Sequence, residues 1–135
     1  MKYWLGVVSK EHVTRGVDGG FAQVCHGKKG PLARMKKDDW LIYYSPGYRL
    51  GKSDLKAFTA IGKVVDEDVF QFKMSPDFVP YRRRVDYLEM QDASLEELKP
   101  VLELCVGPSW GHQLRRGLIE ITKSDFDKIK KVMTK

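Results

Sequence analysis

The chain has 135 residues, with 24 Lys and Arg against 18 Asp and Glu, so its formal net charge is +6. This length fits one domain spanning residues 1–135, and a hydrophobic fraction of 42% excludes a disordered chain. No apolar run is long enough for a transmembrane helix, and the first residues lack the features of a secretory signal. We therefore expect a single cytoplasmic domain with no membrane association, in which Cys25 and Cys105 remain reduced.

The positive charge is concentrated in three segments. The stretch 19–37 holds five basic residues and no acid, Arg82–Arg84 are consecutive, and Arg115–Arg116 lie in the acid-free stretch 104–119. Such segregation predicts one positive face, which is typical of a nucleic-acid-binding protein. The same segments would also suit solvated loops that keep the protein soluble, and composition alone does not separate these two interpretations.

Hydrophobic patterning and turn residues predict a mainly β chain with helices in the connections and at the end. In chain order we expect a strand over 3–8, a helix over 10–15, a strand over 21–25, a helical turn over 31–36, strands over 40–44, 56–65, 69–74 and 83–89, a helical region over 94–105, a strand over 118–121, and a helix after Ser124. Ser9 suits the N-cap of the first helix and Gly16 its end, whereas Ser94 opens a capping-box pattern and Pro100 predicts a break. This order favours the α+β class, as a closed or nearly closed mixed β-barrel of about six strands with flanking helices.

No catalytic set, metal site or cofactor motif is recognisable. Cys25 and His26 are neighbours on a predicted strand, so their side chains would point to opposite faces and form a poor nucleophile–base pair. The spacing of His12, His26 and His112 matches no metal-ligand pattern, and the sequence has neither a phosphate-binding loop nor a paired-carboxylate motif. We therefore expect no catalytic residue, no metal and no cofactor.

Aromatic and polar residues near the basic segments are a stronger indication of function. Tyr43, Tyr44 and Ser45 end a predicted strand. Because Tyr43 and Tyr44 point to opposite faces, at most one of them is expected in the core. Trp4 is expected in the core, whereas Trp110, in a Gly-Pro-Ser-Trp-Gly loop, is expected to line a surface cleft. A flat ring beside hydrogen-bonding groups suits an extruded base, whose faces stack while its edge is read.

Several short motifs follow one another along almost the whole chain. They are Tyr3-Trp4-Leu5, Ser9-Lys10-Glu11-His12-Val13, Gly20-Phe21-Ala22-Gln23-Val24-Cys25-His26-Gly27-Lys28, Pro31-Leu32-Ala33-Arg34-Met35, Tyr43-Tyr44-Ser45-Pro46, Phe58-Thr59-Ala60-Ile61-Gly62, Pro80-Tyr81-Arg82-Arg83-Arg84, Trp110-Gly111, and Leu114-Arg115-Arg116-Gly117. This ordered series resembles the EVE-domain proteins. The resemblance implies a PUA-like fold, related to the YTH domains that read methylated adenine in RNA. It also implies a non-enzymatic role, the binding of a modified base of DNA or RNA in a pocket.

The resemblance places that pocket between the junction 9–10, the segment 23–27 and the strand end 44–46. For the base pocket we expect Ser9, Lys10, Gln23, Val24, His26, Gly27, Tyr44, Ser45, Pro46 and Trp110. For the nucleic-acid backbone we expect Lys28, Arg82, Arg83, Arg84, Arg115 and Arg116, which would supply sequence-independent affinity. YTH readers carry a cage tryptophan on the second strand, where this chain has Phe21-Ala22-Gln23. Hydrogen bonding from the Gln23 amide to a base edge is therefore expected to matter more than an aromatic cage.

Two other functions remain open at this point. The same pocket would suit a small-molecule sensor that binds a free nucleobase, nucleoside or similar heterocycle. An enzyme acting on RNA is the second alternative, because PUA-like domains often accompany modification enzymes, although no catalytic set is found. The expected partner is a nucleic acid, without a decision between DNA and RNA, and the absence of heptad patterning favours a monomer.

Overall fold

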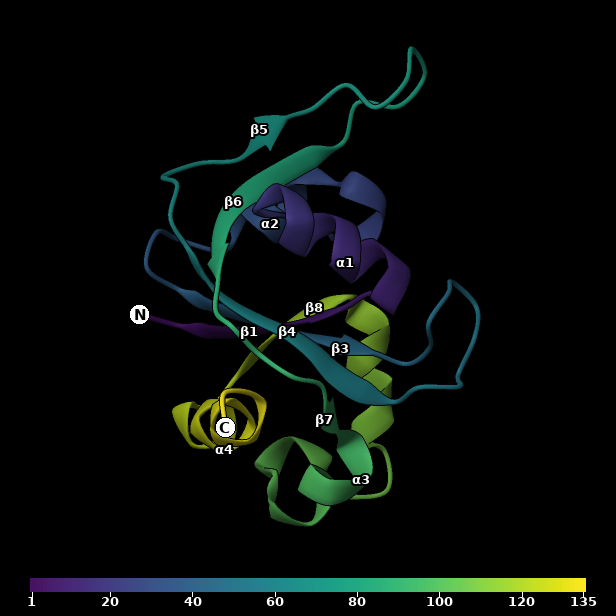
Figure 1. Ribbon diagram of the computed structural model, residues 1–135, viewed down its shortest axis with the longest axis vertical. Coiled ribbons are helices and arrows are strands. Elements are labelled where there is room, and N and C mark those ends of the chain that lie inside the picture. The colour runs from purple at the N-terminus through teal and green to yellow at the C-terminus, as the bar shows by residue number, and fades with distance from the viewer.

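The computed structural model describes residues 1–135 and contains one mixed β-sheet flanked by helices (Figure 1). The strands are β1 (Tyr3–Val7), β2 (Phe21–Ala22), β3 (Trp40–Ser45), β4 (Ala57–Val64), β5 (Phe70–Gln71), β6 (Tyr81–Tyr87), β7 (Ala93–Ser94) and β8 (Leu118–Ile121). The α-helices are α1 (Lys10–Gly19), α2 (Lys29–Ala33), α3 (Leu95–Leu98) and α4 (Lys123–Met133). The 3-10 helices are η1 (Cys25–Gly27), η2 (Lys99–Val101), η3 (Glu103–Cys105) and η4 (Trp110–Arg116). The expected α+β class with flanking helices is confirmed.

Six strands form the main path of the sheet, in the order β2-β6-β4-β3-β1-β8, while β5 pairs with β6 and β7 with β4. β1 and β3 are parallel neighbours, and the other pairs are antiparallel. The path ends at β2 and β8, which do not pair with each other, so the sheet is open. Because β1 and β3 run in the same direction side by side, their carboxyl ends reach the same edge of the sheet.

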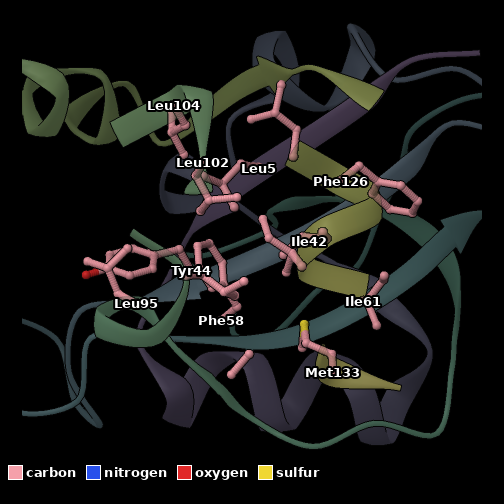
Figure 2. Close-up of a cluster of buried hydrophobic side chains, with 14 of the residues drawn as sticks. Leu5, Ile42, Tyr44, Phe58, Ile61, Leu95, Leu102, Leu104, Phe126 and Met133 are labelled. Carbon is pink, nitrogen blue, oxygen red and sulfur yellow. The ribbon is translucent and has the colours of Figure 1, made fainter. Parts of the chain in front are cut away.

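Both faces of the central strands are buried. Along β3, Leu41 and Tyr43 belong to a cluster of 12 buried residues on one face, whereas Ile42 and Tyr44 belong to a cluster of 15 on the other. Figure 2 shows the larger cluster, in which the rings of Tyr44 and Phe58 meet edge to face with centroids 5.5 Å apart. The expectation that only one of the two tyrosines would be buried is wrong, because a sheet covered on both faces buries both sets of side chains.

Different helices cover the two faces (Figure 1). α1 contributes Val13 and α2 contributes Leu32 to the cluster that contains Tyr43. α3, η3 and α4 supply the helical residues of the cluster that contains Tyr44. Trp4, which is 2% exposed, is a core residue as expected, and its indole Nε1 donates a hydrogen bond of 2.9 Å to Asp39 Oδ2. The burial of both faces leaves the sheet edges as the places where a site can open.

The first helix and the second strand end at different residues from those expected. α1 continues past Gly16, where a Cβ atom would lie 2.6 Å from the carbonyl oxygen of Phe21. Gly16 therefore allows the helix to approach β2 closely, and Gly20, with φ of 69°, ends the helix instead. β2 stops before residue 23, because Cys25 and His26 adopt positive φ values that no strand contains.

The C-terminal half follows the sequence more closely. Ser94 is the N-cap of α3, since its Oγ accepts a hydrogen bond of 3.2 Å from Glu96 N, and Pro100 marks the change from α3 to η2 as expected. The N-cap of α4 is Thr122 rather than Ser124, because the Thr122 hydroxyl accepts a hydrogen bond of 3.1 Å from the backbone amide of residue 125. None of the helices has the length and apolar character needed to cross a membrane.

Candidate functional site

A pocket of about 470 Å³ opens at the edge of the sheet where β1 and β3 end. Four segments and His12 of α1 form its wall. The segments are 7–9 between β1 and α1, 23–28 around η1, the loop 46–52 after β3, and 114–117 at the end of η4. The first three contain or adjoin the three places expected from the resemblance. A volume of this size suits a small organic molecule, a single nucleobase included.

The loop 46–52 is fixed to the first turn of α1. The backbone amides of Lys10 and Glu11 donate hydrogen bonds of 3.0 and 2.9 Å to the carbonyl oxygens of Gly47 and Tyr48. The loop thereby satisfies two amides that a helix N-terminus leaves without partners. Within the loop, a Cβ atom at Gly47 would lie 2.3 Å from the Lys52 carbonyl oxygen, so the tight turn requires glycine. This attachment holds one wall of the pocket against the helix.

The segment 23–28, which supplies another part of the wall, includes three consecutive residues in the left-handed region. Cys25, His26 and Gly27 have φ values of 50°, 60° and 79°. Non-glycine residues in this region cost about 1–3 kcal/mol each and are typical of sites where the backbone shape has a use. The conformation turns the chain away from β2 so that residues 23–28 line the pocket. The Cys25 thiol also contacts the carbonyl oxygen of Arg116 at 3.6 Å, which joins this wall to the end of η4.

Ser9 carries a buried hydroxyl that has no hydrogen-bond partner. Its side-chain oxygen is the only buried side-chain nitrogen or oxygen atom of the protein in this situation, and the residue is 7% exposed and lies in the pocket wall. It is the N-cap of α1, yet its side chain makes no capping hydrogen bond. Nearby Ser45 differs, because its hydroxyl lies 2.7 Å from both the Val8 carbonyl oxygen and Thr59 Oγ1. A buried hydroxyl without a partner costs free energy, so a polar ligand atom in the pocket would compensate for it.

Gln23 lies at another side of the pocket, and its neighbours fix its orientation. Its backbone amide donates a hydrogen bond of 3.3 Å to the Tyr43 hydroxyl, and its side-chain Oε1 accepts one of 3.0 Å from Arg82 Nε. A guanidinium group has only donors, so Arg82 must face the oxygen of the Gln23 amide. The side-chain NH2 group of Gln23 makes no hydrogen bond within the protein, so it remains free to donate.

The rim of the pocket is uniformly basic. Five basic side chains contribute to its wall, and none of its 19 residues is Asp or Glu. These side chains are Lys28, Arg49, Lys52, Arg115 and Arg116. The first and the last two were expected, whereas Arg49 and Lys52 were missed by the sequence reasoning. The available signal was the pair of glycines at 47 and 51, which lie on either side of Arg49 and just before Lys52, shortly after the clearest strand.

Three residues expected in the base pocket lie elsewhere. Tyr44 is buried against Phe58, and Ser45 is engaged by backbone and Thr59 oxygens, so neither lines the pocket. Trp110 is half-buried against the cluster that contains Tyr44, and the Lys99 ammonium lies 5.6 Å from its ring centroid. The expected aromatic pocket is therefore wrong, because no Phe, Tyr or Trp contributes to the wall. Its flat side chains are His12 and His26.

Lys10 and Gly27 also lie outside the wall. The Lys10 ammonium forms an ion pair of 2.5 Å with Asp92, which directs it away from the pocket. A Cβ atom at Gly27 would lie 2.3 Å from Pro80 Cβ, so this glycine packs against the chain before β6. The remaining expected residues, Ser9, Gln23, Val24, His26 and Pro46, do line the pocket.

The arginine triplet does not form one basic patch. Arg83 is 1% exposed, with its Nε 2.6 Å from Asp66 Oδ1 and its other nitrogens on the carbonyl oxygens of Leu32, Met35 and Asp66. Arg82 is also buried, and only Arg84 is exposed. The expectation that all three hold phosphates is wrong for Arg83, because its donors are already used inside the protein.

The titratable groups of the pocket carry no sign of a nucleophile. Burial raises the pKa of the Cys25 thiol, which keeps it protonated near neutral pH. Burial, followed by the charge of Arg15, lowers the pKa of His12 and favours its neutral ring. No three His, Cys, Asp or Glu side chains lie close enough together to hold a metal ion.

An open mixed sheet with helices on both faces and a pocket at the ends of two parallel strands makes this chain an α+β domain. The family model of the EVE domain matches residues 2–132. The chain therefore belongs to the EVE domain family.

Curated relatives extend over nearly the same length. A UPF0310 protein of Streptococcus sanguinis is 49% identical over 130 residues, which cover 93% of this chain and 88% of that protein. The UPF0310 protein YdcG of Bacillus subtilis is 48% identical over 134 residues, covering 97% and 91%.

Solved structures share the fold at low sequence identity. A hypothetical protein from Leishmania major aligns with a TM-score of 0.65 at 14% identity, covering 97% of this chain and 93% of that one. The MmI1 YTH domain aligns with a TM-score of 0.60 at 10% identity, covering 96% and 92%. The expected relation to the YTH fold is thus confirmed.

Proposed function

We propose that this protein is a non-enzymatic nucleic-acid-binding module that holds one base of DNA or RNA, preferably a modified one, in the pocket beside α1. The observation that carries the proposal is the unpartnered, buried hydroxyl of Ser9 in a pocket without any acidic residue. A nucleobase edge presents several hydrogen-bonding atoms, so it would supply the partner that Ser9 lacks.

The distribution of polar groups supports a division between specificity and affinity. The inner wall around Ser9, Gln23 and Val24 is uncharged, whereas the basic side chains occupy the rim. Uncharged donors and acceptors discriminate between base edges. Basic side chains at the entrance hold the phosphates on either side without regard to sequence. Both parts are needed for a base that remains attached to its polymer.

The pocket has to hold the faces of the base without an aromatic cage. The imidazole rings of His12 and His26 are the flat side chains in its wall, and the Arg115 and Arg116 guanidinium groups are planar as well. Imidazole and guanidinium planes both stack on bases. A lowered pKa keeps the ring of His12 neutral, which avoids repulsion between it and the basic rim.

The chemistry of the pocket argues against an enzyme. Its only thiol, on Cys25, has a raised pKa, and no carboxylate is present to act as a base or to orient a histidine. General acid–base catalysis by His12 or His26 would lack the third group that normally orients the imidazole. These features support binding without turnover.

The test compares labelled oligonucleotides that carry one modified base, the same oligonucleotides without it, and free nucleosides, at low and high salt. Ser9→Ala should weaken binding of the preferred oligonucleotide about 2- to 10-fold, which corresponds to one hydrogen bond, without lowering the melting temperature of the protein. Ser124→Ala, which removes an exposed hydroxyl on α4, is the matched control and should change neither. Equal loss for modified and plain oligonucleotides would contradict base recognition. Free nucleosides that bind as tightly as oligonucleotides at every salt concentration would identify a small-molecule sensor instead.

A further inference from the structure

One face of the β2–β6–β5 part of the sheet consists of alternating phenylalanine and arginine side chains. Phe21 of β2 lies opposite Arg84 of β6, and Phe70 of β5 lies opposite Arg82. Directly paired residues of neighbouring strands share a face, as do residues two apart on one strand. The amide of Phe72 extends this ladder by a hydrogen bond of 3.0 Å to the Pro80 carbonyl oxygen.

The side chains on this surface touch one another. The guanidinium carbon of Arg82 lies 3.7 Å from the ring centroid of Phe21 and 4.2 Å from that of Phe72, and the guanidinium carbon of Arg84 lies 4.6 Å from that of Phe70. We call these five residues the Phe–Arg face. Its phenylalanines belong to neither hydrophobic core.

The Phe–Arg face remains open to solvent at its outer side. Phe72 is 49% exposed, and Arg84 is exposed as well. Because the Arg82 guanidinium covers one side of the Phe72 ring, the exposed area lies on the other side and at the ring edge. In Figure 1 β5 and β6 form the far end of the molecule, where no helix covers β5. An exposed phenylalanine with a cation behind it is a poor core residue and a suitable stacking surface.

The Phe–Arg face is directly joined to the pocket. Arg82 belongs to the face, and its Nε donates to the Gln23 side chain in the pocket wall. A strand whose base is held in the pocket therefore has its neighbouring nucleotides within reach of this face. Aromatic rings alternating with guanidinium groups stack on successive bases and attract the phosphates between them. The continuity with an acid-free pocket favours this occupant over a protein partner.

We infer that the Phe–Arg face is a second binding surface for the single-stranded nucleotides next to the base in the pocket. This inference rests on the proposed function, because that function places a base in the neighbouring pocket. The oligonucleotide that tests the Phe–Arg face does not need that base. The probe is a labelled single-stranded oligothymidylate of about ten nucleotides, since stacking platforms tolerate any sequence.

The experiment compares Phe72→Ala and Phe72→Leu with wild type. Both should weaken binding of the oligothymidylate about tenfold, because neither offers a ring on which a base can stack. The leucine variant retains a large apolar side chain, so it separates stacking from hydrophobic contact. Phe72→Tyr should restore binding. Val101→Ala, which trims a similarly exposed apolar residue on η2, is the control and should have no effect. Arg84→Gln should reduce the dependence of log affinity on log salt by about 0.7.

The outcomes separate this inference from the proposed function. The readouts are the binding of the oligothymidylate and of the preferred modified oligonucleotide, with the melting temperature recorded for each variant. Weaker binding of the oligothymidylate by both the alanine and leucine variants of Phe72 supports the Phe–Arg face. If Ser9→Ala meanwhile binds the modified oligonucleotide as tightly as wild type, base recognition in the pocket is overturned. If only Ser9→Ala weakens binding, the Phe–Arg face is overturned and base recognition in the pocket is supported. An equal effect of Phe72→Ala and Val101→Ala also overturns the face.

Discussion

The Nε atom of Arg82 donates a hydrogen bond of 3.0 Å to the side-chain oxygen of Gln23 and thereby determines which end of that amide is left free to donate. Arg82 is itself held between the rings of Phe21 and Phe72. The amide cannot rotate to offer its oxygen to a ligand without placing two NH groups against a guanidinium. Under the proposed function, the base edge would therefore place an acceptor atom opposite Gln23.

Gln23→Glu tests this orientation. The carboxylate would still accept from Arg82, so the fold should keep its stability, but the donor toward the ligand disappears. Affinity for the preferred base should fall about tenfold or more, the size of one base-edge contact. Gln113→Glu, at an exposed site on η4, introduces the same charge and should have a much smaller effect in the same titration. An equal loss in the two variants would attribute the effect to charge alone.

Replacement of the rim residues should change affinity without changing base preference. Arg49→Gln combined with Arg116→Gln removes two cations from the pocket entrance. Binding of modified and plain oligonucleotides should weaken to the same extent, and the slope of log affinity against log salt should fall by about 0.7–0.9 for each cation that no longer neutralises a phosphate. Lys131→Gln on α4 is the control. A change in the preference between the two oligonucleotides would show that the rim also reads the base.

Arg83 and Arg84 are neighbours in sequence, but their replacement should have different consequences. Arg83→Met leaves the Asp66 carboxylate and the carbonyl oxygens of Leu32 and Met35 without their donor. Loss of one partner of a buried ion pair costs about 3–5 kcal/mol of unfolding free energy. Arg84→Met, at an exposed position, should cost within about 0.5 kcal/mol. Urea denaturation measures both, and similar losses would contradict the structural role of Arg83.

Alanine substitutions at two glycines with the same backbone conformation distinguish the cost of a steric contact from the cost of a left-handed backbone. Gly27 and Gly51 have φ of 79° and 81°, but a Cβ atom would lie 2.3 Å from Pro80 Cβ at the first and has no neighbour within 4 Å at the second. Gly51→Ala should cost about 1–2 kcal/mol for the left-handed backbone. Gly27→Ala adds an overpacking cost of about 1–3 kcal/mol. Thermal or urea unfolding of the pair gives the difference, and equal values would mean that the contact with Pro80 relaxes freely.

Alkaline pH should destabilise the protein through Tyr43. Burial raises the pKa of this phenol far above its ordinary value of 10.0, and burial likewise raises the pKa of Tyr87. The folded state thus keeps protons that the unfolded state loses, so this stability is present below about pH 10 and falls as pH rises further. Tyr43→Phe should flatten the decline of unfolding free energy above pH 10. An unchanged slope would assign the effect to other groups.

Much of the fold was predictable because it depends on local patterns. The strand β3, the N-cap at Ser94 and the break at Pro100 were all recognisable, since each follows from residues adjacent in the chain. Gly16 was misassigned as a helix end, because a glycine that permits close packing against Phe21 looks the same in sequence as one that ends a helix. The expected cap at Ser124 was wrong, because the hydroxyl that accepts from the backbone amide of residue 125 belongs to Thr122.

The site was predicted in position more successfully than in composition. Ser9 and Pro46 line the pocket, because the parallel pairing of β1 and β3 brings the carboxyl ends of these strands to one edge. Trp110 was assigned to the pocket because of its Gly-Pro-Ser-Trp-Gly loop. Tyr44 was assigned to it because alternation states that neighbouring side chains point to opposite faces, but not whether both faces are covered. Only the packing of α3 and α4 onto the second face shows that Tyr44 is a core residue.

Charge illustrates the same division. The amino-acid sequence by itself determined a formal net charge of +6, and it placed the basic residues in acid-free segments. Only the tertiary structure decided which of these charges reach solvent: Arg83 is neutralised by Asp66, 17 positions away, while Arg49 and Lys52 reach the pocket rim on a loop. The physical reason is that charge is a property of composition, whereas solvation and pairing depend on which distant segments the fold brings together.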